Sequence, residues 1–307
     1  MKKIAISIGD LNGIGIQLAL ENHEEIKKIV EPLYCIDQEM LQQASRLLNI
    51  SIPNDFNLYE GIAPTFKIEP AKITKESGLY AFSSFQKAVK LTKDKTVEGV
   101  MTLPIHKKAW ELADIGYKGH TDALRDFFKA PAIMMLGCSK MYVALYTEHI
   151  PLKEVTGEIE KVEKLSQFLV DFYKSIELKE GEKIALLGVN PHAGDGGVLG
   201  EEEQYIKEAR ELTHQKIEKE VYTEPLVPDV AFTPNSRKNY HYFVAMYHDQ
   251  GLAPLKALYF DEGINISLNL PIIRTSVDHG TAFDIAYKGV KLNSLSYKNA
   301  LSYFITT

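Results

Sequence analysis

Cysteine is almost absent from this chain of 307 residues, which holds only Cys35 and Cys138. The two lie far apart in the sequence and form no CxxC pair, which disfavours both a disulfide framework and a thiolate zinc site. Such sparse use of cysteine is typical of proteins from a reducing compartment. We therefore expect a cytoplasmic location.

Long apolar runs and an excess of basic residues are also missing. The N-terminal MKKIAISIGDLNG is too short and too interrupted for a signal peptide, and no stretch approaches membrane-spanning length. Lys and Arg number 35 against 41 Asp and Glu, which gives a net charge of −6. We expect no nucleic-acid partner and no membrane surface, so an anionic substrate must be held by local groups.

With 45% hydrophobic and 25% charged residues, the composition is that of a globular enzyme-sized protein. Apolar runs alternate with segments in which apolar residues recur every three or four positions, a pattern that predicts an α/β fold with a largely parallel sheet and helices on both faces. The expected strands are 4–8, 33–36, 97–102, 133–136, 142–146, 184–189, 230–232 and 243–247. The expected helices are 15–29, 38–48, 76–93, 158–176 and 201–219.

No linker divides the chain, but its character changes near residues 116–120 and around Arg274. We therefore predict two lobes. The first holds residues 1–118 and 275–307, and the second is an insertion of residues 119–274. A cleft is expected where such lobes meet.

A dinucleotide fingerprint is absent as well. The loop 190-NPHAGDGGVLG-200 follows a strand and opens a helix, yet its glycines do not have GxGxxG spacing. We interpret it as a compact turn that holds His192 rigidly. The turn 8-IGDLNGIG-15 also lacks this spacing, and a simple strand-to-helix turn explains its glycines as well as a nucleotide-binding turn does.

Three histidines stand just past strand-like runs: His149, His192 and His248. Ligands of open α/β sheets gather beyond the carboxyl ends of the strands, so three imidazoles delivered there indicate a catalytic divalent metal, zinc or a first-row relative. Asp249, beside His248, is a candidate for the same site. Taken singly, each histidine has a structural interpretation, and the spacing alone leaves open whether the three meet.

An anion site is indicated at 117-YKGHTDAL-124, where His120 and Thr121 lead into a helix. The free N–H groups of a helix N-terminus and a hydroxyl suit an anion, although capping by Thr121 explains the pattern equally well. Lys256 could supply countercharge, and so could Arg274, which follows an apolar run at a strand end.

The segments GHTDAL, TEHIPL, NPHAGDGG, YHDQGL and RTSVDHGTA occur in this order, and with them nearly the whole chain resembles the 4-hydroxythreonine-4-phosphate dehydrogenase family of pyridoxal phosphate biosynthesis. The resemblance implies a two-lobed fold similar to isocitrate and isopropylmalate dehydrogenases. It also implies a homodimer whose active site is completed across the interface. NAD or NADP and one divalent ion, Zn, Mg or Co, are the implied cofactors.

The resemblance carries roles onto residues of this chain. The implied metal ligands are His149, His192 and His248; the substrate contacts are His120, Thr121, Lys256, Asn265 and Arg274; the cofactor contacts are His279, Gly280, Thr281, Ala282 and Asp284. Lys256 and Asp249 are the candidates for the general base. The chain departs from the family pattern at Leu11, Ile16, Gln17 and Tyr287, positions that bear on cofactor affinity.

The expected reaction is metal-dependent oxidation of 4-phosphooxy-threonine at C3 by NAD(P)⁺, followed by decarboxylation to 3-amino-2-oxopropyl phosphate. A sister branch of the family oxidises phosphorylated threonate or erythronate, and the motifs do not separate it. An alternative from another class is a metal-free transferase similar to phosphate acetyltransferases. A third is a non-catalytic sensor, which the many polar groups disfavour because buried unpaired histidines are costly.

Overall fold

The computed structural model describes residues 1–306, which form two compact units. The first unit holds Met1–Ala130 and the chain from Ile264 onward, and the second holds Pro131–Gly263. The second unit is shorter at both ends than the predicted second lobe, residues 119–274. Helix α5 (His120–Phe128) and strand β9 (Ile264–Leu268) both belong to the first unit.

The first unit is built on strands in the order β3-β2-β1-β4-β10-β9. Neighbours are parallel except β9, which runs antiparallel to β10. The remaining strands are β1 (Lys3–Ser7), β2 (Glu31–Cys35), β3 (Leu58–Tyr59), β4 (Gly99–Thr102) and β10 (Arg274–Val277). The continuous burial of β1 and β4 is typical of parallel strands covered on both faces.

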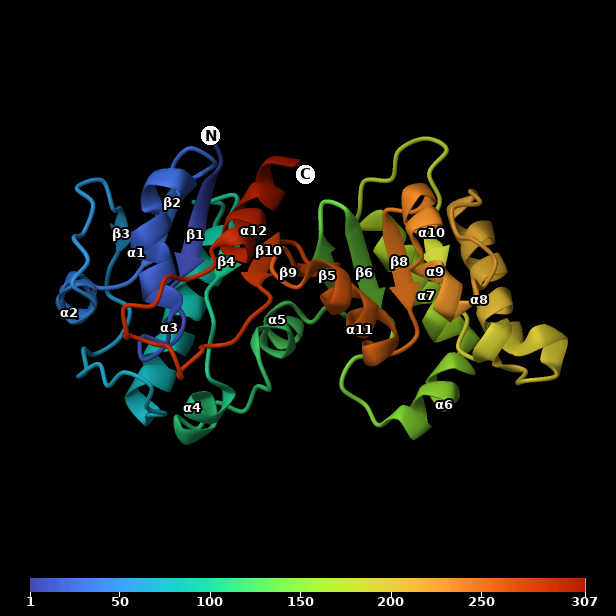
Figure 1. Cartoon of the computed structure of the whole chain (residues 1–307), viewed down its shortest axis with the longest axis horizontal. Coiled ribbons are helices and arrows are strands. Elements are labelled where there is room, and N and C mark those ends of the chain that lie inside the picture. Colours follow the sequence, from blue (N-terminus) through green and yellow to red (C-terminus); the bar gives the residue numbers. More distant parts are fainter. Residues whose placement is uncertain (307) are drawn as a thin grey trace. The chain divides into compact units, whose positions relative to one another are not determined.

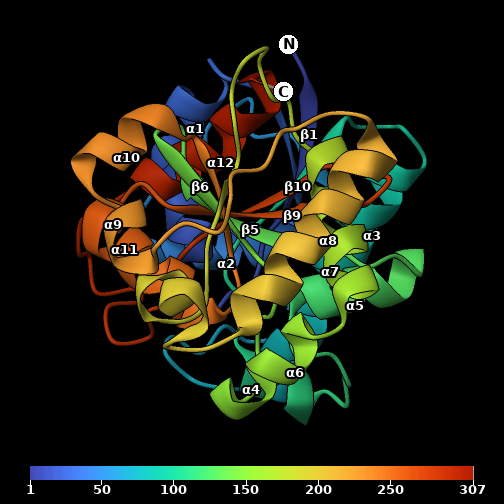
Figure 2. The ribbon, with the colours of Figure 1, turned by 90° about the vertical axis from the view of Figure 1, so that its right-hand side faces the viewer.

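Helices cover this sheet on two sides. Helix α3 packs on β1, β2 and β4, whereas α12 contacts α1 and packs on β4, β9 and β10. Figure 2 shows α1 and α12 on one side of the strands and α3 on the other. The helices of this unit are α1 (Gly15–Ile26), α2 (Gln38–Leu48), α3 (Lys75–Lys93), α4 (Lys107–Leu112), α5 and α12 (Leu295–Thr306).

The second unit has the strand order β5-β6-β8-β7. Strands β5 (Ile133–Cys138) and β6 (Met141–Leu145) form an antiparallel hairpin, while β6, β8 (Tyr242–Ala245) and β7 (Ala185–Leu186) are parallel neighbours. Helix α11 (His248–Tyr259) packs on β5, β6 and β8. Figures 1 and 2 show α9, α10 and α11 on one side of these strands and α7 and α8 on the other.

The other elements of the second unit are short helices and two 3₁₀ turns beside the long helices α7 and α8. They are η1 (Leu152–Glu154), α6 (Val155–Ile159), α7 (Val162–Lys174), η2 (Pro191–Gly197), α8 (Glu202–Ile217), α9 (Pro228–Ala231) and α10 (Pro234–Asn239). A buried core cluster covers one face of this sheet, where Val143 and Phe243, register partners on β6 and β8, cluster with Leu255 of α11.

The α/β class and the largely parallel strands are confirmed. Two predictions are wrong. The expected strand 230–232 lies instead in and just after helix α9, because Pro228 occupies the first helical position, where its fixed φ favours a helix. The expected single helix 158–176 is two helices, because Lys161 leaves helical geometry at φ −80° and ψ 67°.

Within residues 1–306, no helix combines the length and the apolar character needed to cross a membrane.

Candidate active site

A buried guanidinium forms the centre of the first unit's candidate site. Arg274, the first residue of β10, is 2% exposed. Its Nε and Nη2 donate to Thr102 Oγ1 at 3.1 and 2.7 Å, and its Nη1 donates to Ser267 Oγ at 3.3 Å and Asn265 Oδ1 at 3.4 Å. All of these acceptors are neutral. Within the described chain no carboxylate pairs with Arg274, and burial lowers its pKa to about 9.

His120 lies directly against this cation. Its Nδ1 is 3.2 Å from Arg274 Nη2, and its ring packs edge-on against Phe85 and Trp110 at centroid distances of 4.7 and 5.4 Å. Burial, and then the Arg274 charge, hold the pKa of His120 well below its usual range, so the ring is neutral. Because guanidinium only donates, Nδ1 accepts and the proton sits on Nε2. That Nε2 is buried without a partner.

Thr121 lies inside α5 and does not cap it. The N-cap position is Gly119, which offers no side-chain bond, so the capping interpretation of Thr121 is wrong. Thr121 Oγ1 lies instead 3.4 Å from Ser267 Oγ, the same hydroxyl that accepts from Arg274. The fold thus gathers four predicted substrate residues, His120, Thr121, Asn265 and Arg274, around one buried positive charge.

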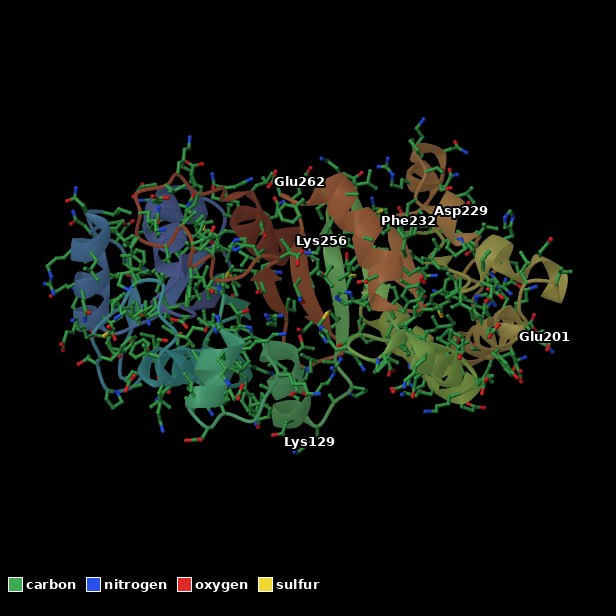
Figure 3. All side chains as sticks on the ribbon, turned by 60° about the horizontal axis from the view of Figure 1, so that its bottom comes forward. Lys129, Glu201, Asp229, Phe232, Lys256 and Glu262 are labelled. Atoms are coloured by element: carbon green, nitrogen blue, oxygen red, sulfur yellow. The ribbon has the colours of Figure 1, made fainter. Side chains whose placement is uncertain are left out.

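The fifth predicted substrate residue, Lys256, belongs to the second unit. It projects from α11, with its Nζ 5.7 Å from the centre of the Phe260 ring (Figure 3).

The three predicted metal ligands follow three adjacent parallel strands. His149 follows β6, His248 follows β8 and opens α11, and His192 follows β7. Since parallel neighbours end at the same edge of a sheet, the three loops that carry the histidines emerge at one edge of the second unit. The rings of His149 and His248 are neighbours, with centroids 5.6 Å apart.

Asp249 orients one of these rings. Its Oδ1 lies 2.7 Å from His248 Nδ1, which directs the other nitrogen of the imidazole, Nε2, away from the carboxylate. A carboxylate on the far nitrogen is the usual support of a metal-ligating histidine. The donor chemistry therefore fits a borderline divalent ion such as zinc or cobalt.

His192 is exposed on the η2 turn, and the backbone there is unusual. All six residues from His192 to Gly197 have positive φ, from 44° to 97°. The ligand atoms of the three histidines do not all lie within 4.8 Å of one another, since the described residues contain only one such group, His23, Glu24 and Asp55.

That other group is an ion-pair network. Lys27 Nζ lies 2.9 Å from Glu24 and 2.8 Å from Asp55, while His23 Nδ1 is 3.0 Å from Tyr34 OH. The carboxylates already have a cation, so we assign no metal to them.

The predicted cofactor segment 279–284 packs onto the first glycine turn. Thr281 O accepts from Ile14 N at 3.1 Å, and a Cβ at Gly13 would lie 2.8 Å from the same oxygen. Other N–H groups of the turn are also used, because Gly13 N and Asn12 N donate to Asp10. These bonds are those of a strand-to-helix turn.

Three of the residues that depart from the family pattern, Leu11, Gln17 and Tyr287, form hydrogen bonds between the N-terminal turn and the segment after residue 284. Tyr287, at φ +59°, donates its hydroxyl to Leu11 O at 2.6 Å, and Gln17 Nε2 donates to Val290 O at 3.0 Å. Both bonds join the N-terminal turn to the segment after 284. These departures therefore tie the two segments together.

Sequence reasoning missed two residues of the buried cation site. Thr102 accepts two N–H groups from Arg274, and Ser267 links Arg274 to Thr121. Thr102 ends β4 at the start of TLPIHK, and a hydroxyl at the carboxyl end of a parallel strand was the available signal. For Ser267 the signal was the alternation of the segment INISL, which places its side chain on the same face of β9 as Asn265.

Comparison with known proteins places the whole chain among relatives. The family model described as pyridoxal phosphate biosynthetic protein PdxA matches residues 28–304. A 4-hydroxythreonine-4-phosphate dehydrogenase of Sulfurimonas denitrificans is 57% identical over 97% of this chain and 95% of its own length. One of Campylobacter fetus is 51% identical over 99% and 98%.

Among solved structures, the 4-hydroxythreonine-4-phosphate dehydrogenase of Klebsiella pneumoniae matches with a TM-score of 0.81. The sequence identity is 30%, and the match covers 100% of both chains.

Proposed function

The chain belongs to the family of the pyridoxal phosphate biosynthetic protein PdxA, and from this premise we propose that it oxidises 4-hydroxythreonine 4-phosphate (4-phosphooxy-threonine) at C3. It is a dehydrogenase of a phosphorylated small molecule, with a nicotinamide cofactor. The proposed oxidation leaves a ketone β to the carboxylate, from which CO₂ is lost to give 3-amino-2-oxopropyl phosphate.

The single observation that supports this proposal best is the buried Arg274 without a counter-ion. A buried charge is stable only when it is paired, so the site requires an anion. In the proposed complex, an anionic group of the substrate pairs with the charge of Arg274 and replaces a neutral acceptor such as Asn265 Oδ1, at 3.4 Å, while the unpartnered Nε2–H of His120 adds a further donor. Thr121, Asn265 and Lys256 are proposed as further substrate contacts.

We assign a divalent ion, Zn, Mg or Co, to His149, His192 and His248. When bound, such an ion lowers the pKa of a substrate hydroxyl and so favours loss of its proton near neutral pH. Asp249 holds the His248 ring through its 2.7 Å contact with Nδ1. Lys256 or Asp249 would accept the proton.

For the nicotinamide, NAD or NADP, we propose contacts at His279, Gly280, Thr281, Ala282 and Asp284. When bound, the cofactor accepts the hydride from C3. Because Thr281 O binds the backbone of the first glycine turn, this loop is held from one side, while Asp284 is exposed.

We also propose a homodimer, with each active site completed by the second subunit, in the cytoplasm. Large apolar side chains are exposed next to two of the histidine loops. Leu152, after His149, is 67% exposed, and Val198, after His192, is 79% exposed. Exposed apolar groups that gather near a site favour a protein interface there.

The test is a direct assay of the metal-supplemented protein. Phosphorylated 4-hydroxythreonine and phosphothreonate are each supplied with NAD⁺ and with NADP⁺, and absorbance of the reduced nicotinamide is followed. We expect turnover with the amino substrate, and loss of turnover with a chelator. Turnover with phosphothreonate alone would move the protein to the sister branch. No reduced nicotinamide under any condition would overturn the proposal in favour of a transferase or a sensor.

A further inference from the structure

The loops that carry His149 and His248 are joined by backbone pairing. The β6–β8 ladder continues past Leu145, because Tyr146 N donates to Ala245 O at 2.9 Å and Thr147 N donates to Met246 O at 3.2 Å. The Thr147 hydroxyl adds a bond to the same Met246 oxygen at 2.6 Å. These two loops are thus held together to within two residues of each histidine.

The loop that carries His192 separates from its neighbour earlier. The last backbone bond that the described chain shows between the β7 and β8 segments is Leu187 N to Val244 O, at 3.0 Å. Beyond it, Gly188 N turns to Leu226 O at 2.9 Å, on the other side. Backbone pairing therefore does not set the position of the His192 loop relative to His248.

One side chain fills this gap. Gln250, in the first turn of α11 and 8% exposed, accepts from Met246 N through Oε1 at 2.7 Å. Its Nε2 donates to Gly188 O at 2.6 Å. The amide stands between the two segments as an inserted peptide group would, and extends their ladder past the end of the strands.

The residues between Gly188 and His192 are also held in place. Glu203 Oε1 accepts from Val189 N at 2.8 Å and from Asn190 N at 2.7 Å. The chain then enters the turn of positive φ, which costs about 1–2 kcal/mol for each residue other than glycine. Such a turn persists only where its surroundings over-determine it. The place of Gly188–Asn190 thus sets the place of His192.

We propose that Gln250 is the positioning residue that sets the distance of His192 from His149 and His248. The inference deepens the proposed function, because it rests on the metal assignment to these three histidines. His149 and His248 keep their spacing through backbone pairing, whereas the buried amide of Gln250 is what ties the segment before His192 to the segment before His248.

The test uses Co²⁺ alone, added to the full-length metal-free protein, with affinity and the visible absorption band as readouts. Gln250→Leu keeps the size of the side chain and removes both bonds. We expect Co²⁺ binding to weaken about 10- to 100-fold, as is typical when support of a ligand is lost. The absorption band should move toward that of His192→Ala, in which the ligand itself is missing.

The matched control is Gln43→Leu in the first unit. Gln43 bridges two backbone groups in the same manner, accepting from Ile68 N and donating to Phe66 O. We expect a comparable loss of thermal stability with unchanged Co²⁺ affinity. A second variant, Gln250→Glu, keeps the shape and the acceptor for Met246 N and replaces the donor to Gly188 O with a carboxylate oxygen that repels it, so it tests the bridge if the leucine variant does not fold.

The outcomes separate the two proposals. If the unaltered protein binds Co²⁺ and His248→Ala abolishes binding, but both Gln250 variants bind with unchanged affinity and band, the role of Gln250 is refuted and the metal site stands. If the unaltered protein does not bind Co²⁺, both fall.

Discussion

Nη2 of Arg274 lies 3.2 Å from Nδ1 of His120, so a buried guanidinium donates to a buried neutral imidazole. Neither group neutralises the charge of the other. The proton of the imidazole is on Nε2, which has no hydrogen-bond partner. One unpartnered donor beside one uncompensated charge is an arrangement that suits an anion.

Inorganic phosphate should therefore stabilise the protein. A ligand that binds only the folded state adds about 2.7 kcal/mol to the free energy of unfolding at 100 times its Kd. We expect the thermal midpoint to rise with phosphate in the unaltered protein but not in Arg274→Met, which keeps the length of the side chain without its charge. Arg46→Met, on the exposed side of α2, is the control and should respond to phosphate as the unaltered protein does.

Catalysis should be sensitive to the same cation. Loss of a buried charge pair costs about 2–5 kcal/mol, so Arg274→Ala should weaken substrate binding and raise KM far more than it lowers kcat. Steady-state kinetics with the phosphorylated substrate measures both. An unchanged KM would remove Arg274 from the binding site.

Acid should destabilise the fold through His120. Its pKa is held well below the usual range in the folded state, whereas the unfolded chain binds a proton near pH 6.5. The free energy of unfolding should thus have its full value above pH 6.5, and should fall below it by about 1.4 kcal/mol per pH unit from this group. His120→Gln should flatten the dependence between pH 6.5 and 5.5 in urea unfolding. Identical slopes for both proteins would show that the imidazole does titrate when buried.

Asp10 should have the opposite dependence. Burial raises the pKa of this carboxyl to about 6, so the folded state keeps a proton that the unfolded chain loses near pH 4. Stability should therefore fall as the pH rises from about 4 to 6, by at most about 3 kcal/mol. Asp10→Asn can keep both contacts, accepting from Asn12 N and donating to Ser77 Oγ. We expect it to be at least as stable as the unaltered protein at pH 7, and a large loss there would show that the ionised carboxylate is the stable form.

Much of the framework was predictable because periodicity reports which faces are buried. The helix 38–48 matches α2 at both ends, and the runs before the three histidines are strands. Short elements were not predictable in this way. The run 264–273 alternates apolar and polar residues as far as Leu270, which favours one strand that ends at Arg274. The structure divides the run instead, because the chain turns at Asn269, where φ is +56°, and Arg274 begins β10.

In the candidate site, too, some features were predictable from the sequence and others were not. The residue types that suit anions and metals could be read directly from the sequence, and three of the other four substrate candidates lie around Arg274. The bonds that hold them could not be read. Thr102 lies 172 residues from Arg274, and Gln250 contacts Gly188 across 62 residues. Hydrogen bonds of this span follow from the packing of the whole unit and leave no local pattern.

Removal of any one of the three histidines tests the metal assignment. His149→Ala, His192→Ala and His248→Ala should each abolish turnover and leave the fold intact, because three neutral nitrogens are the expected minimum of a catalytic zinc-type site. Circular dichroism and the thermal midpoint check the fold, and bound metal is counted by elemental analysis. His241→Ala, in the same unit, should retain both metal and activity. Near-normal activity in all three variants would refute the assignment.

The geometry of the η2 turn offers the most selective test of how His192 is held. Gly194 and Gly196 both have positive φ, at 78° and 66°, so alanine at either position carries a similar backbone cost of about 1 kcal/mol. Their surroundings differ. A Cβ at Gly194 would lie 2.7 Å from Glu203 Oε2 and 2.7 Å from Gly200 O, whereas a Cβ at Gly196 meets nothing within 4 Å.

Gly194→Ala should push the turn off Glu203, displace His192 and weaken Co²⁺ binding, while Gly196→Ala should lose a little stability and bind Co²⁺ normally. Equal Co²⁺ affinities in the two variants would mean that the contact between the turn and Glu203 does not control the position of His192.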